Sequence, residues 1–169
     1  MMSVFETMKN RYSVRKYKDQ PVEDEKLEKI LEAARLAPTG TNSQAFKVYV
    51  IDVKKHVDKI KEVYTKDWIL DAPYILAVVS KANDAWIRQW DSKNINEIDA
   101  TIVMDHMILT ATELGLGTCY IAAFHERALI DLLDLPEEYH PVLITPLGYA
   151  DSEPVKNSRK DLNDLVEYV

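Results

Sequence analysis

The stretch IDATIVMDHMILTATEL, residues 98–114, limits the possible folds of this chain more than any other part of the sequence. Its apolar residues occupy nearly every side of the expected helix and are interrupted by Asp99, Asp105, His106 and Glu113. A helix that is apolar almost all round has to be enclosed, either within a large core or by a partner chain. In a chain of 169 residues, a second subunit is a natural cover. The stretch therefore predicts a central helix and favours a homodimer.

Helical and extended patterns alternate along the rest of the chain, and its length fits a single domain over residues 1–169. The spacing of apolar residues predicts helices at residues 4–8, 22–37, 53–64 and 128–135. Alternating or continuous apolar runs predict strands at residues 45–52, 72–80, 118–124 and 141–150. The run at 72–80 is apolar throughout, so we expect it at the centre of a sheet. This mixture indicates an α+β or α/β domain of three layers.

Net charge and cysteine content limit the kinds of binding partner and the cellular location to be expected. The formal net charge of −7 and the pI near 5.1 argue against nucleic acid or an anionic membrane as the main partner. Cys119 is the single cysteine, so no disulfide can form within the chain, and a cytoplasmic location fits best. We find no signal-peptide pattern and no window apolar enough to span a membrane.

The acidic chain nevertheless gathers cations in the stretch KNRYSVRKYKDQ, residues 9–20. Such a cluster is more often a solvated face, but the spacing of Arg11 and Arg15 lets both guanidinium groups converge, with the Ser13 hydroxyl between them. A guanidinium binds phosphate oxygens in a bidentate manner that a lysine ammonium does not. A second basic group, Lys156 and Arg159, lies near the other end of the chain. Two such groups make an anion site a strong alternative to a solvated face.

Several other positions allow two interpretations each. The loop PTGTNSQ, residues 38–44, is either a plain helix–strand connection or a source of hydrogen bonds from Asn42 and the backbone to a flat polar heterocycle. Residues 81–97 are expected to be polar and irregular, and within them Trp86 and Trp90 are either a local packing cluster or an aromatic wall for a planar ligand. Asp99 is interpreted as a helix-packing or capping group. The four histidines lack metal-ligand spacing, and the dinucleotide and P-loop fingerprints are absent.

Five further segments stand in order along the chain: RYSVRKY, LEKILEAARLAPTGTNSQAFKVYVI, ELGLGTCYIAAF, LGYAD and KNSRKDL. Taken together and in this order, they resemble the FMN-dependent nitroreductase family. The resemblance implies an α+β fold with a mostly antiparallel sheet of four or five strands, in an interlocked homodimer that binds FMN at the subunit interface. It also implies an oxidoreductase that uses NADH or NADPH to reduce a small electrophilic acceptor, such as a quinone or nitroaromatic, by a ping-pong mechanism. No catalytic side chain is assigned, because the flavin would carry the electron chemistry.

The resemblance also assigns contacts to the cofactor in four groups. The motif for the FMN phosphate and ribityl chain corresponds to Arg11, Ser13 and Arg15, with Tyr12 contacting the flavin mainly through its backbone. A loop that reaches the flavin from the partner subunit corresponds to Pro38, Thr39, Gly40 and Asn42, with Gln44 as a weaker candidate. A strand over the flavin ring corresponds to Tyr120, Ile121, Ala122 and Ala123. A second phosphate clamp corresponds to Arg159 with Lys156 or Asn157.

Two segments are expected to vary or to reach the partner. Residues 80–98 correspond to a variable cover over the substrate, and residues 150–169 to a C-terminal extension that packs on the partner subunit. Two other functions stay open. One is a flavin-binding or sensing module without significant turnover, and the other is a purely structural dimerisation domain, which only the apolar helix at 98–114 supports.

Overall fold

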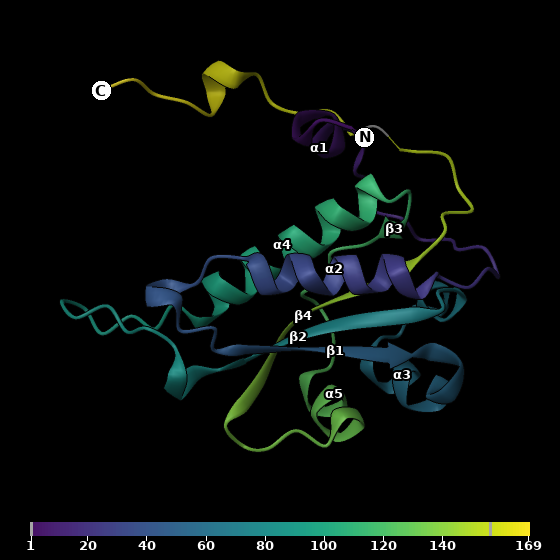
Figure 1. Cartoon of the computed structure of the whole chain (residues 1–169), viewed down its shortest axis with the longest axis horizontal. Helices are drawn as coiled ribbons and strands as arrows, with labels where there is room; N and C mark the ends of the chain where they lie inside the picture. Colours follow the sequence, from purple (N-terminus) through teal and green to yellow (C-terminus); the bar gives the residue numbers. More distant parts are fainter. Residues whose placement is uncertain (1, 156) are drawn as a thin grey trace.

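The computed structural model describes residues 2–155 and 157–169, and its centre is a four-stranded antiparallel sheet (Figure 1). The strand order is β1-β2-β4-β3. The strands are β1 Phe46–Asp52, β2 Tyr74–Lys81, β3 Gly117–Thr118 and β4 Tyr139–Gly148. The helices are α1 Val4–Asn10, α2 Asp24–Leu36, α3 Val57–Val63, α4 Asn96–Glu113 and α5 Glu126–Leu133. The α+β class and the antiparallel sheet expected from the sequence are confirmed.

Strand β2 shows why the structure has three layers. Its side chains alternate between the two faces of the sheet. Leu76 and Val78 belong to the core shared with α2 and α4, whereas Ile75 and Ala77 belong to a second core shared with α3 and α5 (Figure 1). Because helices cover both faces, the strand is apolar throughout, which confirms its predicted central place.

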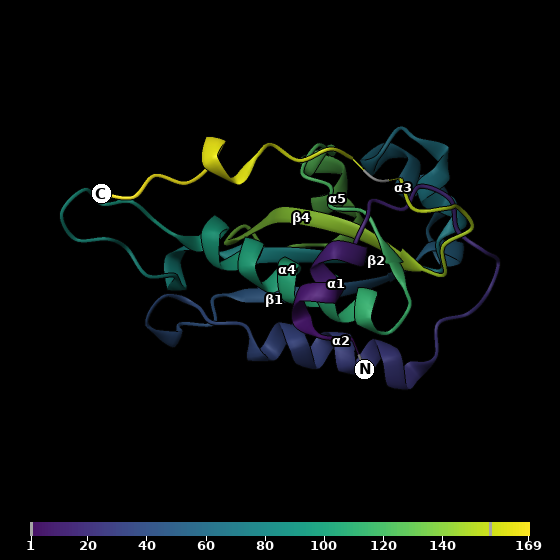
Figure 2. The same cartoon turned by 90° about the horizontal axis from the view of Figure 1, so that it is seen from above.

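Helix α4 is enclosed largely by its own chain. Ala100, Val103, Met104 and Met107 are fully buried. They pack against α2 and the sheet, and α1 lies against another side of α4 (Figure 2). Helix α4 is therefore buried, as its sequence requires, but the same chain rather than a second subunit provides most of the burial. Among the described residues, no helix has the length and apolarity needed to cross a membrane.

Helix α1 has its apolar side chains on the outside. A capping box starts it: the Ser3 amide donates to a Glu6 carboxylate oxygen at 2.9 Å, and the Glu6 amide donates to the Ser3 hydroxyl at 3.2 Å. Thr7 is the buried residue of this helix, whereas Val4, Phe5 and Met8 are exposed. An apolar surface of this kind on a short capped helix is typical of a contact with another chain.

The C-terminal segment leaves the body of the domain after β4 and runs back along the long axis of the molecule (Figures 1 and 2). It contains one short 3₁₀ turn, Leu162–Asp164. Its apolar side chains are exposed: Val155, Leu162, Leu165, Val166, Tyr168 and Val169. The segment therefore contributes little to the core of its own chain.

Candidate functional site

Backbone pairing brings the two basic segments of the sequence together. The residues before α2 run beside the end of β4, where the Lys18 amide donates to the Tyr149 carbonyl and the Asp151 amide donates to the Lys16 carbonyl, both at 2.9 Å. The Tyr12 hydroxyl extends this contact by donating to the Ser152 carbonyl at 2.8 Å. Residues 12–18 thus fix the path of the chain as it leaves β4, and the second basic segment follows directly.

A hollow of about 560 Å³ lies where these segments meet. Its lining includes five of the residues assigned from the sequence: Arg11, Tyr12, Ser13, Asn157 and Arg159. Residues of α1 and of the C-terminal segment complete it: Met8, Lys9, Asn10, Pro154 and Val155. Lys156, the alternative partner of Arg159, lies outside the described residues.

Arg15 lies beside this hollow but does not line it. It is exposed, and one of its guanidinium nitrogens donates to the Ser13 carbonyl at 3.4 Å. Arg11 is half-buried. The positive charges of Arg15 and Arg11 also act on the buried Cys119 thiol: burial raises its pKa, and the two arginines and a hydrogen bond with Ser13 oppose that rise. The basic segment is thus held close to Cys119, which directly follows β3.

Gly117 allows this close approach. Val14 pairs with the strand through its amide, which donates to the Thr118 carbonyl at 2.9 Å. A Cβ on Gly117 would stand 2.7 Å from a Val14 methyl carbon. The second glycine of ELGLGTCYIAAF therefore makes room for the basic segment, while Gly115, with φ +77°, ends α4 in the left-handed conformation.

The residues that follow Cys119 differ in what they offer a ligand. Tyr120, Ala122 and Ala123 are exposed. Ile121 is buried, and its amide and carbonyl both form hydrogen bonds with Ile144 at 3.0 Å. Its backbone amide and carbonyl are therefore already bonded within the chain. The expected strand at 118–124 is reduced to β3 and this one isolated bridge, since the Cys119 amide donates to the Thr145 hydroxyl rather than to a strand carbonyl.

The loop at residues 38–44 lies at the opposite end of the sheet. It leads into Phe46, which pairs with Ser80, whereas Thr118 pairs with Leu147, the partner of Tyr74. The six residue steps from Tyr74 to Ser80 correspond to about 20 Å along a strand. Within one chain the structure therefore does not bring Pro38, Thr39, Gly40 or Asn42 to the hollow that Arg11 lines.

This loop is a short 3₁₀ turn with an unusual backbone. Thr41, Asn42 and Gln44 all have positive φ, at 52°, 57° and 50°. Such values are uncommon outside glycine and persist where the surroundings hold them. One support is the Thr39 hydroxyl, which accepts from the Gln44 amide at 3.0 Å. Another is Asp99 of α4, whose carboxylate accepts from the Gly40 amide.

The segment between β2 and α4 is irregular, as expected, and it projects at the same end of the molecule as the loop (Figure 1). Its two tryptophans have different surroundings. Trp86 lies close to Gly40, because a Cβ on Gly40 would stand 3.1 Å from the Trp86 Cβ. Trp90 is 78% exposed, and the Arg88 guanidinium lies 5.5 Å from the centre of its ring. Trp86 is thus half-buried beside Gly40, whereas Trp90 faces solvent in this chain.

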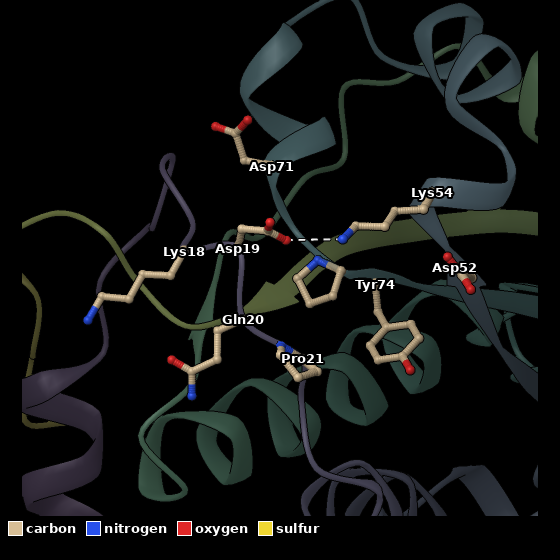
Figure 3. Close-up of a pocket in the computed structure, with 9 residues that line it drawn as sticks. Lys18, Asp19, Gln20, Pro21, Asp52, Lys54, Asp71 and Tyr74 are labelled. Carbon is tan, nitrogen blue, oxygen red and sulfur yellow. Dashed lines mark hydrogen bonds and ion pairs between the residues drawn. The ribbon is translucent and has the colours of Figure 1, made fainter.

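A second hollow of about 360 Å³ lies beside the start of β2 and carries mixed charge. Lys54 donates to Asp19 across it at 3.0 Å, and Lys18 points away from that pair (Figure 3). Asp52 and Asp71 add two more carboxylates to its lining. This balance of charges suits a phosphate less well than the hollow lined by Arg11 and Arg159. Across the described residues, no group of three or more His, Cys, Asp or Glu is placed to hold a metal ion.

Known proteins that resemble this chain point to one family. The model of the nitroreductase family matches residues 8–68 and 53–149. A nitroreductase family protein of Clostridium difficile 630 has the same fold, with a TM-score of 0.91 and 38% identity over 99% of this chain and 98% of that one. An FMN-dependent nitroreductase of Clostridium difficile R20291 has a TM-score of 0.79 and 28% identity over 96% of both chains. The FMN reductase [NAD(P)H] of Bacillus subtilis is 30% identical over 94% of this chain and 70% of its own length.

The chain therefore belongs to the nitroreductase family. Both solved relatives from Clostridium difficile are matched over nearly their whole length.

Proposed function

We propose that this chain is an FMN-dependent oxidoreductase that uses NADH or NADPH to reduce small electrophilic acceptors such as quinones or nitroaromatics. The observation that most strongly supports this proposal is that Arg11, Ser13 and Arg159 line one hollow, although they come from opposite ends of an acidic chain. Guanidinium groups and a hydroxyl are the donor set that a phosphomonoester dianion requires. FMN has such a phosphate, and relatives named FMN reductase and FMN-dependent nitroreductase support that choice.

When bound, FMN would supply the electron-carrying chemistry, and the residues of this chain would bind and orient it. Arg11, Ser13 and Arg159, with Asn157, would hold the phosphate and ribityl end. Tyr120, Ala122 and Ala123 present exposed groups along the strand that would lie near the ring. In a ping-pong cycle the nicotinamide donor and the acceptor would use the same pocket in turn, which requires no separate dinucleotide fingerprint. A reducing cytoplasm suits a chain whose single cysteine is a buried thiol.

We also propose that the site is completed by a second copy of the chain. The loop at residues 38–44 lies a sheet's length from the hollow of its own chain, so Thr39, Gly40 and Asn42 would act on the partner's flavin. The exposed apolar residues of α1 and of the C-terminal segment support such an assembly, because both surfaces lack cover in a single chain. Residues 150–169 would then pack on the partner subunit.

The test starts with the purified full-length protein and its absorption spectrum. We expect a yellow protein, or one that takes up added FMN, whose flavin absorbance bleaches when NADH or NADPH is added without oxygen. Steady-state oxidation of NAD(P)H with a quinone or nitroaromatic would then separate an enzyme from a flavin-binding module. A colourless protein that takes up no FMN would contradict the proposal, and light scattering that finds only monomer at micromolar concentration would contradict the dimer.

A further inference from the structure

The anchor of the loop Thr39–Gln44 is a buried carboxylate. Asp99 lies in the first turn of α4 and is only 5% exposed. Both of its carboxylate oxygens lie within hydrogen-bond distance of the Gly40 amide, at 3.1 and 3.2 Å. A buried carboxylate is costly unless it is bonded, and here the Gly40 amide and the positive end of α4 both favour its charge. Burial raises the pKa of Asp99, and the hydrogen bond from Gly40 partly opposes that rise.

The side chains of Ile95 and Trp86 also lie directly against Gly40. An added Cβ at Gly40 would stand 2.4 Å from the Ile95 Cδ1 atom and 3.1 Å from the Trp86 Cβ, so the glycine is seated directly against the segment between β2 and α4. The Ile95 amide in turn donates to the Trp86 carbonyl at 3.3 Å. Gly40 is thus held between Asp99 and the packed pair of Trp86 and Ile95.

Three residues with positive φ follow this anchored glycine within four positions of the chain. Their conformation is unfavourable in isolation and has to be imposed by fixed neighbours. Gly40 also accepts from the Ser43 amide at 3.0 Å, so its position sets the turn that contains Asn42. Releasing Gly40 would let Thr41, Asn42 and Gln44 relax to more ordinary conformations.

From this geometry we infer that Asp99 is a positioning residue for the loop Thr39–Gln44. By accepting the hydrogen bond from the Gly40 amide, it holds the loop in the conformation that presents Asn42 to the partner subunit's flavin. The inference rests on the proposed function. Asp99 would not touch the flavin itself, and its effect on the flavin would pass through Gly40. Loss of its carboxylate is expected to weaken FMN binding by about tenfold, the usual size of a lost hydrogen bond to a charged group.

The test uses the full-length protein in three forms, wild type, Asp99→Ala and Asp99→Asn, with Asp105→Ala as the control. Asp105 is exposed on the same helix. Two quantities are measured: the dissociation constant of FMN by flavin fluorescence, and the amide hydrogen exchange of ¹⁵N-labelled glycine in the FMN-free protein. The chain has four glycines, so Gly115, Gly117 and Gly148 report on the rest of the fold.

We expect Asp99→Ala to speed exchange at Gly40 while the other three glycines stay protected, and to raise the dissociation constant of FMN about tenfold. Asp99→Asn keeps one acceptor oxygen and should recover part of both effects, whereas Asp105→Ala should match the wild type. An FMN affinity within threefold of the wild type would overturn the inference, and so would equal loss of protection at all four glycines. If the wild type itself binds no FMN, the proposed function fails, and the exchange measurement still shows whether Asp99 orders the loop.

Discussion

The two ends of the sheet are built in different ways. At one end, backbone pairing of residues 12–18 with the strand at Thr118 and the exit from β4 sets the positions of Arg11 and Ser13. At the other end, the loop Thr39–Gln44 is a strained turn that depends on a few side-chain contacts, of which Asp99 is the buried one. We call the end with Arg11 and Ser13 the phosphate end and the end with the loop Thr39–Gln44 the loop end. The phosphate end should keep its backbone structure when a side chain is replaced, whereas the loop end should lose its backbone conformation when one side-chain contact is removed.

Removal of the arginines from the phosphate end should give the largest effect. Replacing Arg11 and Arg159 together with Ala should raise the dissociation constant of FMN by roughly a hundredfold or more, because two charge-assisted contacts to the phosphate are lost. The free energy of unfolding of the FMN-free protein should change little, since neither side chain is fully buried. Flavin fluorescence titration and urea denaturation measure the two quantities.

Lys18 provides the matched control, because it belongs to the same basic stretch but lines the other hollow (Figure 3). Lys18→Ala should bind FMN as the wild type does. If it weakened binding as much as the arginine pair, the phosphate would have to be placed in the mixed-charge hollow instead.

Crowding at Gly117 should test the backbone pairing itself. Gly117→Ala adds a methyl group 2.7 Å from a Val14 methyl carbon and should lower the free energy of unfolding by about 1–3 kcal/mol, the usual cost of overpacking. In a Val14→Ala background the same change should cost clearly less, since the colliding methyl carbon is gone. Urea denaturation of the four proteins gives the coupling. Equal costs in both backgrounds would mean that Val14 is not what Gly117 accommodates.

The smallest expected effect concerns a surface carboxylate at the phosphate end. The Tyr149 hydroxyl donates to Glu23 at 2.7 Å and accepts from Lys26 at 2.7 Å, and the hydrogen bond from Tyr149 keeps the pKa of Glu23 below its ordinary value. Asp99 at the other end has the opposite shift, because burial dominates there. A lowered pKa means that the folded state favours the charged form of Glu23.

Tyr149→Phe should therefore lower the melting temperature by only about one or two degrees near neutral pH. The contribution is present above the pKa that Glu23 has in the unfolded chain, and it is lost as the pH falls through the lower pKa of the folded state. Thermal melts from pH 7 to pH 3 should show the gap between the two proteins closing on the acid side. A gap that widened on acidification would contradict this assignment of the contact.

The sequence alone predicted the elements that depend on local pattern. It predicted the apolar helix, the apolar strand β2 and the irregular segment after β2. These could be predicted because an element buried on both sides consists mostly of apolar residues, whereas an exposed segment consists mostly of polar ones. The order of the family motifs also identified Arg11, Ser13 and Arg159 as candidates for one site. Their meeting in one hollow agrees with that assignment, and their contact with FMN stays a proposal.

Only the tertiary structure decided what encloses α4 and what holds the loop. The pattern of α4 demanded a cover but could not say that α2, the sheet and α1 of the same chain supply most of it, since enclosure looks alike from either source. Asp99 was interpreted as a packing or capping residue, and nothing local could link it to Gly40, 59 positions earlier. Local chemistry fixes which residues need a partner, whereas the path of the chain fixes which partner they meet.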